Sequence, residues 1–437
     1  MTGMVRRAAL VAALVVSVPG AAQGGADSMQ VASEDSTWQE HAQAGEAARR
    51  AEDWGGWRYH LVRMREEVGY HPNLVYALAR ADARLGRTED ALGWLQAFAA
   101  SGLVRDVAND SAFAQMRAGA AWEALAARIE ANGRPIASAQ QAFALTDSAF
   151  MPEGIAFDPR SRRFFLSSLR SGRILSYAVD GGFADFVPAG RDGQWAMLGI
   201  AVDTLTRTLW ATTYAGPYFT GYAAADSGKS AVLAYDLDTG ALRRRYLPPE
   251  GARHQLGDIA VSADGDVFVS DADEGVVYRI ERGEEEMEAF AQDELVSPQG
   301  LVVTSDGRRV LVADYVRGIA SLERESGELT WLPVPDSVAV SGIDGLARVG
   351  HRLIAVQNGV APKRVIELRL DDEERRITGW RPLESATPLL TEPTHVTVVG
   401  GEVFFIADSG WDRLDPDGQL KPGMVLEPAH VLRLAVP

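Results

Sequence analysis

The sequence predicts a mainly β protein, a six-bladed β-propeller preceded by a small all-α region of helical repeats. Two observations predict this fold. After residue 140 the spacing of apolar residues changes from about 3.6 to 2, and a similar strand–turn–strand unit recurs six times. Before that point, between Thr37 and about Asn132, the chain is rich in Ala, Leu, Arg and Glu and contains a single proline, Pro72.

The repeated unit opens with a short apolar strand, which we call the head of the unit. The six heads are P-E-G-I-A-F-D at 152–158, M-L-G-I-A-V-D at 197–203, L-G-D-I-A-V-S at 256–262, P-Q-G-L-V-V-T at 298–304, I-D-G-L-A-R-V at 343–349 and P-T-H-V-T-V-V at 393–399. They start at intervals of 42 to 59 residues, and each precedes a polar turn and a second apolar strand. Short antiparallel strands at this period are typical of propeller blades, and two stacked β-sandwiches would fit the regular spacing poorly.

A propeller must also close into a ring. The strand-like segment A-F-A-L-T-D at 142–147 precedes the first head, and we expect it to join the last blade beside the strand His430–Val436. The propeller is therefore expected to cover residues 140–437.

The helical region is expected to cover residues 37–135. Its pattern predicts helices at 41–51, 54–68, 74–85, 88–100 and Ser111–Asn132. The run L-G-R-x-x-D-A-L resembles a tetratricopeptide repeat, with the usual spacing only partly kept. Such a region either binds a protein partner in a groove or packs as a cap on the main domain. Two helix pairs make only a short groove, which favours the cap.

Residues 1–22 have the anatomy of an export signal. Arg6 and Arg7 precede the apolar run Ala8–Val18, and small residues follow, with cleavage expected after Ala22. The alternative is an uncleaved anchor; no later stretch is long and apolar enough to cross a membrane. The chain has no cysteine, which excludes disulfides, thiolate metal sites and cysteine nucleophiles. We expect an exported protein, periplasmic or secreted.

The charge of the chain limits its partners. The formal net charge is −17 and the isoelectric point about 4.9. Nucleic acids and anionic membrane surfaces both require a basic face, so neither is expected as a partner.

The heads bring polar side chains to one place. In a propeller the innermost strand of each blade starts at one mouth of the axial channel, so residues at the six heads converge there. The position before the head glycine, or its counterpart, carries in turn Glu153, Leu198, Gly257, Gln299, Asp344 and Thr394, and Asp258 and His395 stand one place further on. Carboxylate and amide oxygens are the ligands that Ca²⁺ prefers. The sequence therefore predicts a divalent-metal site, with Ca²⁺ as the expected ion and Glu153, Gln299, Asp344 and Asp258 as its ligands.

A cation at this mouth would polarise an ester or lactone carbonyl and lower the pKa of a bound water. His395 or a carboxylate, Asp344 in particular, would then move the proton, which makes these two the expected catalytic residues. Each acid also has a simpler interpretation. An acid at a head can cap strand amides, and Asp258 can form a hydrogen bond with a turn. His395 can be a histidine of the channel whose hydrogen bonds are all made within the protein.

The heads resemble those of the senescence marker protein (regucalcin)/gluconolactonase family of six-bladed calcium hydrolases, with paraoxonase and diisopropyl fluorophosphatase as distant relatives. The similarity covers roughly residues 140–437. In that family the first-blade head carries a metal-binding glutamate, which Glu153 in P-E-G-I-A-F matches. The fifth-blade head carries an aspartate, which Asp344 in I-D-G-L-A matches.

The resemblance also has departures. The family's fourth-blade asparagine is Gln299 here, and Gly257 stands where the third-blade asparagine is expected. The neighbouring Asp258 resembles the acidic residue that follows this asparagine in relatives. His395 falls where some relatives place a histidine near the channel. The resemblance implies a calcium-dependent lactonase or esterase, with the third-blade ligand lost.

Two further groups of residues have competing interpretations. Asp271, Asp314 and Asp408 end second strands, where such acids usually bond the next blade's turn. An aromatic group in and around the second-blade insertion either walls an apolar substrate pocket or packs as a loop. It consists of Trp195, Tyr214, Tyr218, Phe219 and Tyr222.

The sequence thus favours an exported, Ca²⁺-dependent hydrolase of a small-molecule lactone or ester, with the metal at the mouth of the propeller channel. No G-x-S-x-G, H-E-x-x-H or P-loop motif points to another enzyme class. The alternative is a non-catalytic propeller that serves as a binding module, with the helical repeats recruiting a protein partner.

Overall fold

The computed structural model describes residues 37–292 and 294–436. The chain divides into two compact units. One contains the helices up to Arg134 together with Val334–Ser341, and the other contains Pro135–Pro333 and the chain from Gly342 onward. The expected export signal, residues 1–22, lies outside the described residues. In the part that the structure describes, no helix has the length and apolar character needed to span a membrane.

The helical unit contains consecutive helices, each packed against the next in the chain. They are α2 (Trp38–Arg50), α3 (Trp54–Val68), α4 (Pro72–Arg84), α5 (Thr88–Ala100) and α6 (Ala120–Ala131), with the short 3₁₀ turn η1 (Ser111–Phe113) before α6. The first begins with a capping box, because Thr37 N donates to Glu40 Oε2 at 2.8 Å while the Thr37 side chain accepts from Glu40 N. The likeness to tetratricopeptide repeats stays a prediction.

The predicted helix Ser111–Asn132 is wrong in its first half. The chain makes the turn η1, continues through further turns and becomes helical only at Ala120. Asp110 Oδ1 accepts a hydrogen bond from Ala112 N at 3.0 Å, a local contact that competes with helix formation. Gly119 then serves as the N-cap of α6 in an extended conformation.

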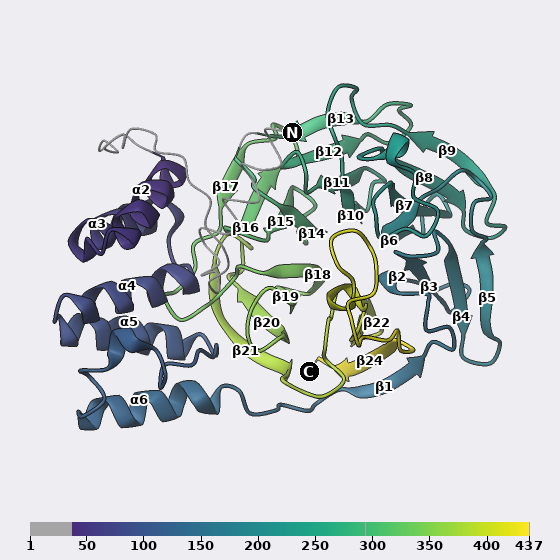
Figure 1. Ribbon diagram of the computed structural model, residues 1–437. Coiled ribbons are helices and arrows are strands. Elements are labelled where there is room, and N and C mark those ends of the chain that lie inside the picture. Colours follow the sequence, from purple (N-terminus) through teal and green to yellow (C-terminus); the bar gives the residue numbers. More distant parts are fainter. Residues whose placement is uncertain (1–36, 293, 437) are drawn as a thin grey trace. The chain divides into compact units, whose positions relative to one another are not determined.

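The second unit is a ring of six four-stranded sheets (Figure 1). Its blades are β2 (Pro152–Asp158), β3 (Arg163–Ser168), β4 (Ile174–Ala178), β5 (Gly182–Val187); β6 (Ala196–Asp203), β7 (Thr208–Tyr214), β8 (Ser230–Asp236), β9 (Leu242–Tyr246); β10 (Leu256–Val261), β11 (Val267–Asp271), β12 (Val276–Ile280), β13 (Glu288–Ala291); β14 (Pro298–Val303), β15 (Arg309–Asp314), β16 (Gly318–Glu323), β17 (Leu329–Trp331); β18 (Ile343–Val349), β19 (Arg352–Gln357), β20 (Arg364–Leu370), β21 (Ile377–Ser385); and β22 (Val396–Val399), β23 (Glu402–Ile406), β24 (His430–Ala435), β1 (Gln140–Ala144). The first strands of the blades contact one another in a closed circuit, so they line the axis. The predicted propeller and its six heads are confirmed.

The ring closes through its first and last strands. β1 pairs antiparallel with β24, with Gln140 opposite Arg433 and Ala144 opposite His430. The predicted closure is therefore confirmed, although the strand lies at 140–144 rather than 142–147. The last sheet has the order β1-β24-β23-β22, so it contains residues from both ends of the propeller unit.

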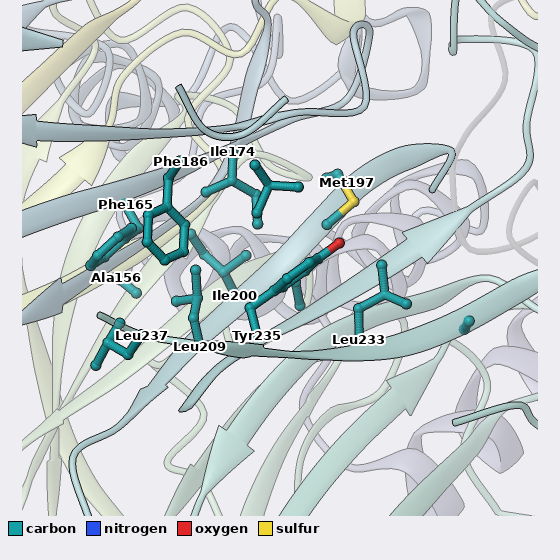
Figure 2. Close-up of a cluster of buried hydrophobic side chains, with 13 residues drawn as sticks. Ala156, Phe165, Ile174, Phe186, Met197, Ile200, Leu209, Leu233, Tyr235 and Leu237 are labelled. Atoms are coloured by element: carbon teal, nitrogen blue, oxygen red, sulfur yellow. The ribbon is translucent and has the colours of Figure 1, made fainter. Parts of the chain in front are cut away.

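The core lies between neighbouring blades. Figure 2 shows one cluster that joins Phe165 and Phe186 of the first blade to Leu209, Leu233 and Tyr235 of the second. Most of these side chains are fully buried, and each apolar side chain of this size stabilises the fold by roughly 1.5–3 kcal/mol. Similar clusters lie between other pairs of adjacent blades.

Each of the first five heads carries the same β-bulge. Pairing with the second strand is interrupted between Pro152 and Ile155, and the same interruption recurs at the starts of β6, β10, β14 and β18. A Cβ atom at Gly154 would lie 2.5 Å from Leu198 O, and one at Gly300 would lie 2.6 Å from Asp344 O. The heads approach their neighbours so closely that glycine is required there, and the bulge frees the preceding side chain from the sheet.

Candidate active site

Four of the predicted site residues come together at the axis of the ring. Glu153 lies on β2, Asp258 on β10, Asp344 on β18, and His395 one residue before β22. His395 Nε2 forms an ion pair with Asp258 Oδ1, and the charges of all four groups act on one another. Glu153 is 7% exposed and Asp258 5% exposed. We call these four residues the axial cluster.

His395 supplies the positive charge of the axial cluster. Burial by itself lowers the pKa of His395, but the ion pair with Asp258 and the charges of Glu153 and Asp344 raise it to about 10. The imidazole is therefore protonated at neutral pH, and both ring nitrogens are donors. Nε2 forms the ion pair with Asp258 without the alignment of a hydrogen bond, and the buried Nδ1 also has no hydrogen-bond partner among the described residues.

Glu153 is a buried carboxyl group held by an indole. Trp411 Nε1 donates to Glu153 Oε2 at 2.6 Å. Burial, and then the charge of Asp344, raise the pKa of Glu153 to about 8, against the opposing effects of His395 and Trp411. Glu153 is thus largely protonated at neutral pH.

Asp344 is held by an amide that directly follows the second strand of the same blade. Asn358 Nδ2 donates to Asp344 Oδ2 at 2.6 Å and to Pro393 O at 3.0 Å. Tyr315 OH in turn donates to Asn358 Oδ1 at 2.9 Å, which fixes the orientation of the amide. Burial raises the pKa of Asp344 to about 7; His395 opposes this shift and the charge of Asp258 adds to it.

Gln299 does not join the axial cluster. Its amide Nε2 donates to Ser297 Oγ at 3.1 Å. Within residues 37–292 and 294–436, no hydrogen bond connects Gln299 to the other four predicted site residues. Gln299 lies at the fourth head, but its long side chain finds a partner two residues earlier in its own strand connection.

The residues as placed do not fit the expected calcium site. Asp258 is paired with His395, Glu153 with Trp411, and Asp344 with Asn358. The third head offers only the hydrogen of Gly257 where an oxygen ligand was expected. Across the described chain, no group of three or more His, Asp or Glu side chains has an arrangement that could hold a metal ion.

The acids that end the second strands are structural. Asp271 Oδ1 accepts from Gln255 N at 3.0 Å. Asp314 Oδ2 accepts from the backbone N of Val296 at 2.6 Å and of Ser297 at 2.9 Å. These acids fix the loop that leads into the head of their own blade, whereas the next blade's turn was expected. Asp408 likewise binds within its own blade, accepting from Gly410 N at 3.1 Å.

Two loops of the propeller unit pack against each other, and one of them reaches the axial cluster through Trp411; we call the two loops the roof. They are segment 215–229, between β7 and β8, and segment 407–429, between β23 and β24, which is drawn in yellow over the middle of the ring in Figure 1. The rings of Tyr218 and Trp411 meet with centroids 4.6 Å apart. Of the predicted aromatic group, Tyr214, Tyr218 and Phe219 join one apolar cluster with Trp411. The side chain of Trp195 instead contacts Arg245.

The sequence did not predict two residues of this site, Trp411 and Asn358. Trp411 begins the short 3₁₀ turn η3 (Trp411–Arg413) in a long loop with no periodic pattern. Asn358 directly follows the strand L-I-A-V-Q, and its polar character next to a second strand was the only signal that could have indicated it.

No family model and no curated protein matches this chain. Solved structures do match it. The PQQ-bound aldose sugar dehydrogenase from Streptomyces coelicolor is 12% identical with a TM-score of 0.48, over 69% of this chain and 99% of that one. A gluconolactonase from Xanthomonas campestris is 17% identical with a TM-score of 0.44, over 69% of this chain and 94% of that one. A virginiamycin B lyase from Staphylococcus aureus is 13% identical with a TM-score of 0.43, over 68% of this chain and 99% of that one. These likenesses concern the fold alone.

Proposed function

We propose that the axial cluster hydrolyses a lactone or a related small ester. The observation that carries this proposal is the buried Nδ1–H of His395, a charged donor without a partner among the described residues. Leaving a buried donor unsatisfied costs about 1–3 kcal/mol or more. The carbonyl oxygen of a bound ester would satisfy it.

The pKa values of the neighbouring carboxyl groups suit them to acid and base roles. Asp344, with a pKa of about 7, is ionised in a large fraction of molecules at neutral pH and can take a proton from water. Glu153, with a pKa of about 8, is mostly protonated and can give a proton to the leaving alkoxide.

The proposed reaction is balanced within these groups. Water loses a proton to Asp344 as its oxygen bonds to the carbonyl carbon, and the imidazolium of His395 stabilises the developing oxyanion. The carbon–oxygen bond to the alkoxide then breaks, and Glu153 protonates the leaving oxygen. A proton passes from Asp344 to Glu153 to restore the starting state. Asp258 keeps His395 charged and oriented throughout.

A calcium ion remains a separate proposal. Glu153, Asp258 and Asp344 would supply its oxygen ligands only after exchanging the partners that they now have. No step above depends on the ion.

The experiment is a hydrolysis assay of the purified protein with neutral lactones and aryl esters. Asp344→Asn and His395→Gln should each lower kcat/KM by at least about 100-fold. Asp180→Asn, which changes an exposed acid in the turn between β4 and β5, is the matched control and should leave kcat/KM unchanged. No turnover by the wild-type protein, or full turnover by both variants, would exclude the proposal and favour the non-catalytic binding role.

A further inference from the structure

The roof is closely packed at one glycine. Gly418 has φ +75°, and a Cβ atom there would overlap Pro217 O and come within 3.1 Å of Tyr218 Cα. Arg170 Nη1 also donates to Gly418 O at 3.1 Å. Because these contacts join the loop of the last blade to residues of the first two, they hold the roof together.

A second glycine of the same loop offers a matched comparison. Gly423 has φ +80°, similar to that of Gly418, but a Cβ atom there would meet nothing within 4 Å. Alanine at either position carries the same backbone strain. Only at Gly418 does the added methyl group also separate the two loops.

The two loops of the roof pack against the propeller through one apolar cluster. This cluster consists of Met151, Leu169, Ala196, Leu198, Tyr214 and Leu414, with Tyr218, Phe219, Trp411 and Leu426 packed against them. The indole N–H of Trp411 bonds to Glu153 Oε2. An indole N–H can only donate a hydrogen bond. It therefore binds Oε2 both when Glu153 is ionised and when Glu153 is protonated at Oε1.

We propose that Trp411 is a positioning residue for Glu153 and that the packing of the roof holds Trp411 against the axial cluster. The contacts within the roof keep the indole in place, and the indole–carboxyl bond fixes the Glu153 side chain. The effect on turnover rests on the function proposed above, whereas the bond and its dependence on the roof do not.

The first test needs no substrate. In protein labelled with ¹⁵N-tryptophan, the Trp411 indole N–H signal is identified by its loss in Trp411→Phe. We expect this proton to exchange slowly with solvent in the wild type, and at least about tenfold faster in Gly418→Ala, with no change in Gly423→Ala. Exchange at the rate of an exposed indole in the wild type, or equal exchange in Gly418→Ala and the wild type, would overturn the proposal. If Gly418→Ala does not fold, Tyr218→Ala, which removes the ring in contact with Trp411, takes its place.

The second test uses turnover. Trp411→Phe keeps an aromatic ring in the roof and removes only the donor, so it should lower kcat by about 10- to 100-fold with little change in KM. Unchanged kcat in an active protein would overturn the positioning role and leave the hydrolase proposal intact. A wild-type protein that hydrolyses no ester would remove the hydrolase proposal, and the exchange experiment would then decide on the roof alone.

Discussion

His395 and Asp258 form an ion pair across the axis of the ring, although their blades are the sixth and the third. Both stand one place after the head position, where the other four heads have glycine. At Gly199, for example, a Cβ atom would lie 2.5 Å from Gly257 O. The two heads that depart from the glycine pattern are therefore the two whose side chains reach across the ring and bind each other.

This ion pair should make the stability of the protein depend on pH. The pKa of His395 is about 10 in the folded protein and 6.5 ordinarily, so the folded state binds more protons between these values. The stabilisation by His395 is complete below pH 6.5 and is lost as the pH rises to about 10, by up to about 1.4 kcal/mol per pH unit. Melting curves of the wild type and His395→Gln should converge over this range. A difference that does not vary with pH would contradict the assignment.

The glycine at the fifth head should tolerate no side chain. A Cβ atom at Gly345 would overlap Thr394 O and lie 2.9 Å from His395 Cα. We expect Gly345→Ala to destabilise the propeller by about 2 kcal/mol, measured from its urea transition. Gly257→Ala is the control, because its Cβ would meet nothing nearer than Ser270 Oγ at 3.3 Å. Equal destabilisation by both changes would show that the close approach of the heads is not the cause.

Calcium binding should become tighter when Gly257 and His395, which depart from the expected calcium site, are replaced. Gly257→Asn adds the missing amide oxygen, and His395→Asn releases Asp258 from its ion pair. Titration calorimetry should show at least about tenfold tighter Ca²⁺ binding by the double variant than by the wild type. Tight binding by the wild type that is lost in both Glu153→Gln and Asp344→Asn would instead support the calcium site expected from the sequence.

The charge of the axial cluster should select against anionic substrates. Three carboxyl groups face one imidazolium in a buried region, where electrostatic effects are screened little by salt. At pH 9, where Glu153 and Asp344 are both largely ionised, a lactone that carries a carboxylate should have a KM at least about tenfold higher than its neutral amide, and this ratio should be smaller at pH 6, where both acids are largely protonated. Equal KM values for the two lactones would indicate that the charged part of the substrate stays outside the roof.

The sequence predicted the fold well because the propeller depends on repeated local patterns. Each head alternates apolar residues, ends in a polar turn and occurs at a blade-sized interval, so six blades follow directly. The prediction of a helix at Ser111–Asn132 was wrong in its first half for a local reason. Asp110 accepts a hydrogen bond from a neighbouring amide, and Gly119 interrupts the helical pattern. Apolar spacing alone does not report such competition.

The site was predictable only as far as the ring geometry determines it. Glu153, Asp258, Asp344 and His395 converge because the inner strands of a closed ring must start near one point. The partner of each side chain does not follow from that geometry. Gln299 turns to Ser297, and Trp411 reaches Glu153 from a loop whose path depends on tertiary contacts such as that between Tyr218 and Trp411.

Ring closure by β1 and β24 also sets the order in which the axial cluster can be assembled during synthesis. Glu153 leaves the ribosome early, whereas His395 and Trp411 belong to the blade that is synthesised last. Until β24 has emerged and paired with β1, the acids lack both the imidazolium that balances them and the indole that orients one of them. A nascent chain therefore contains the three acids of the axial cluster before the cluster can form. Translation of the final blade completes the ring and the axial cluster together.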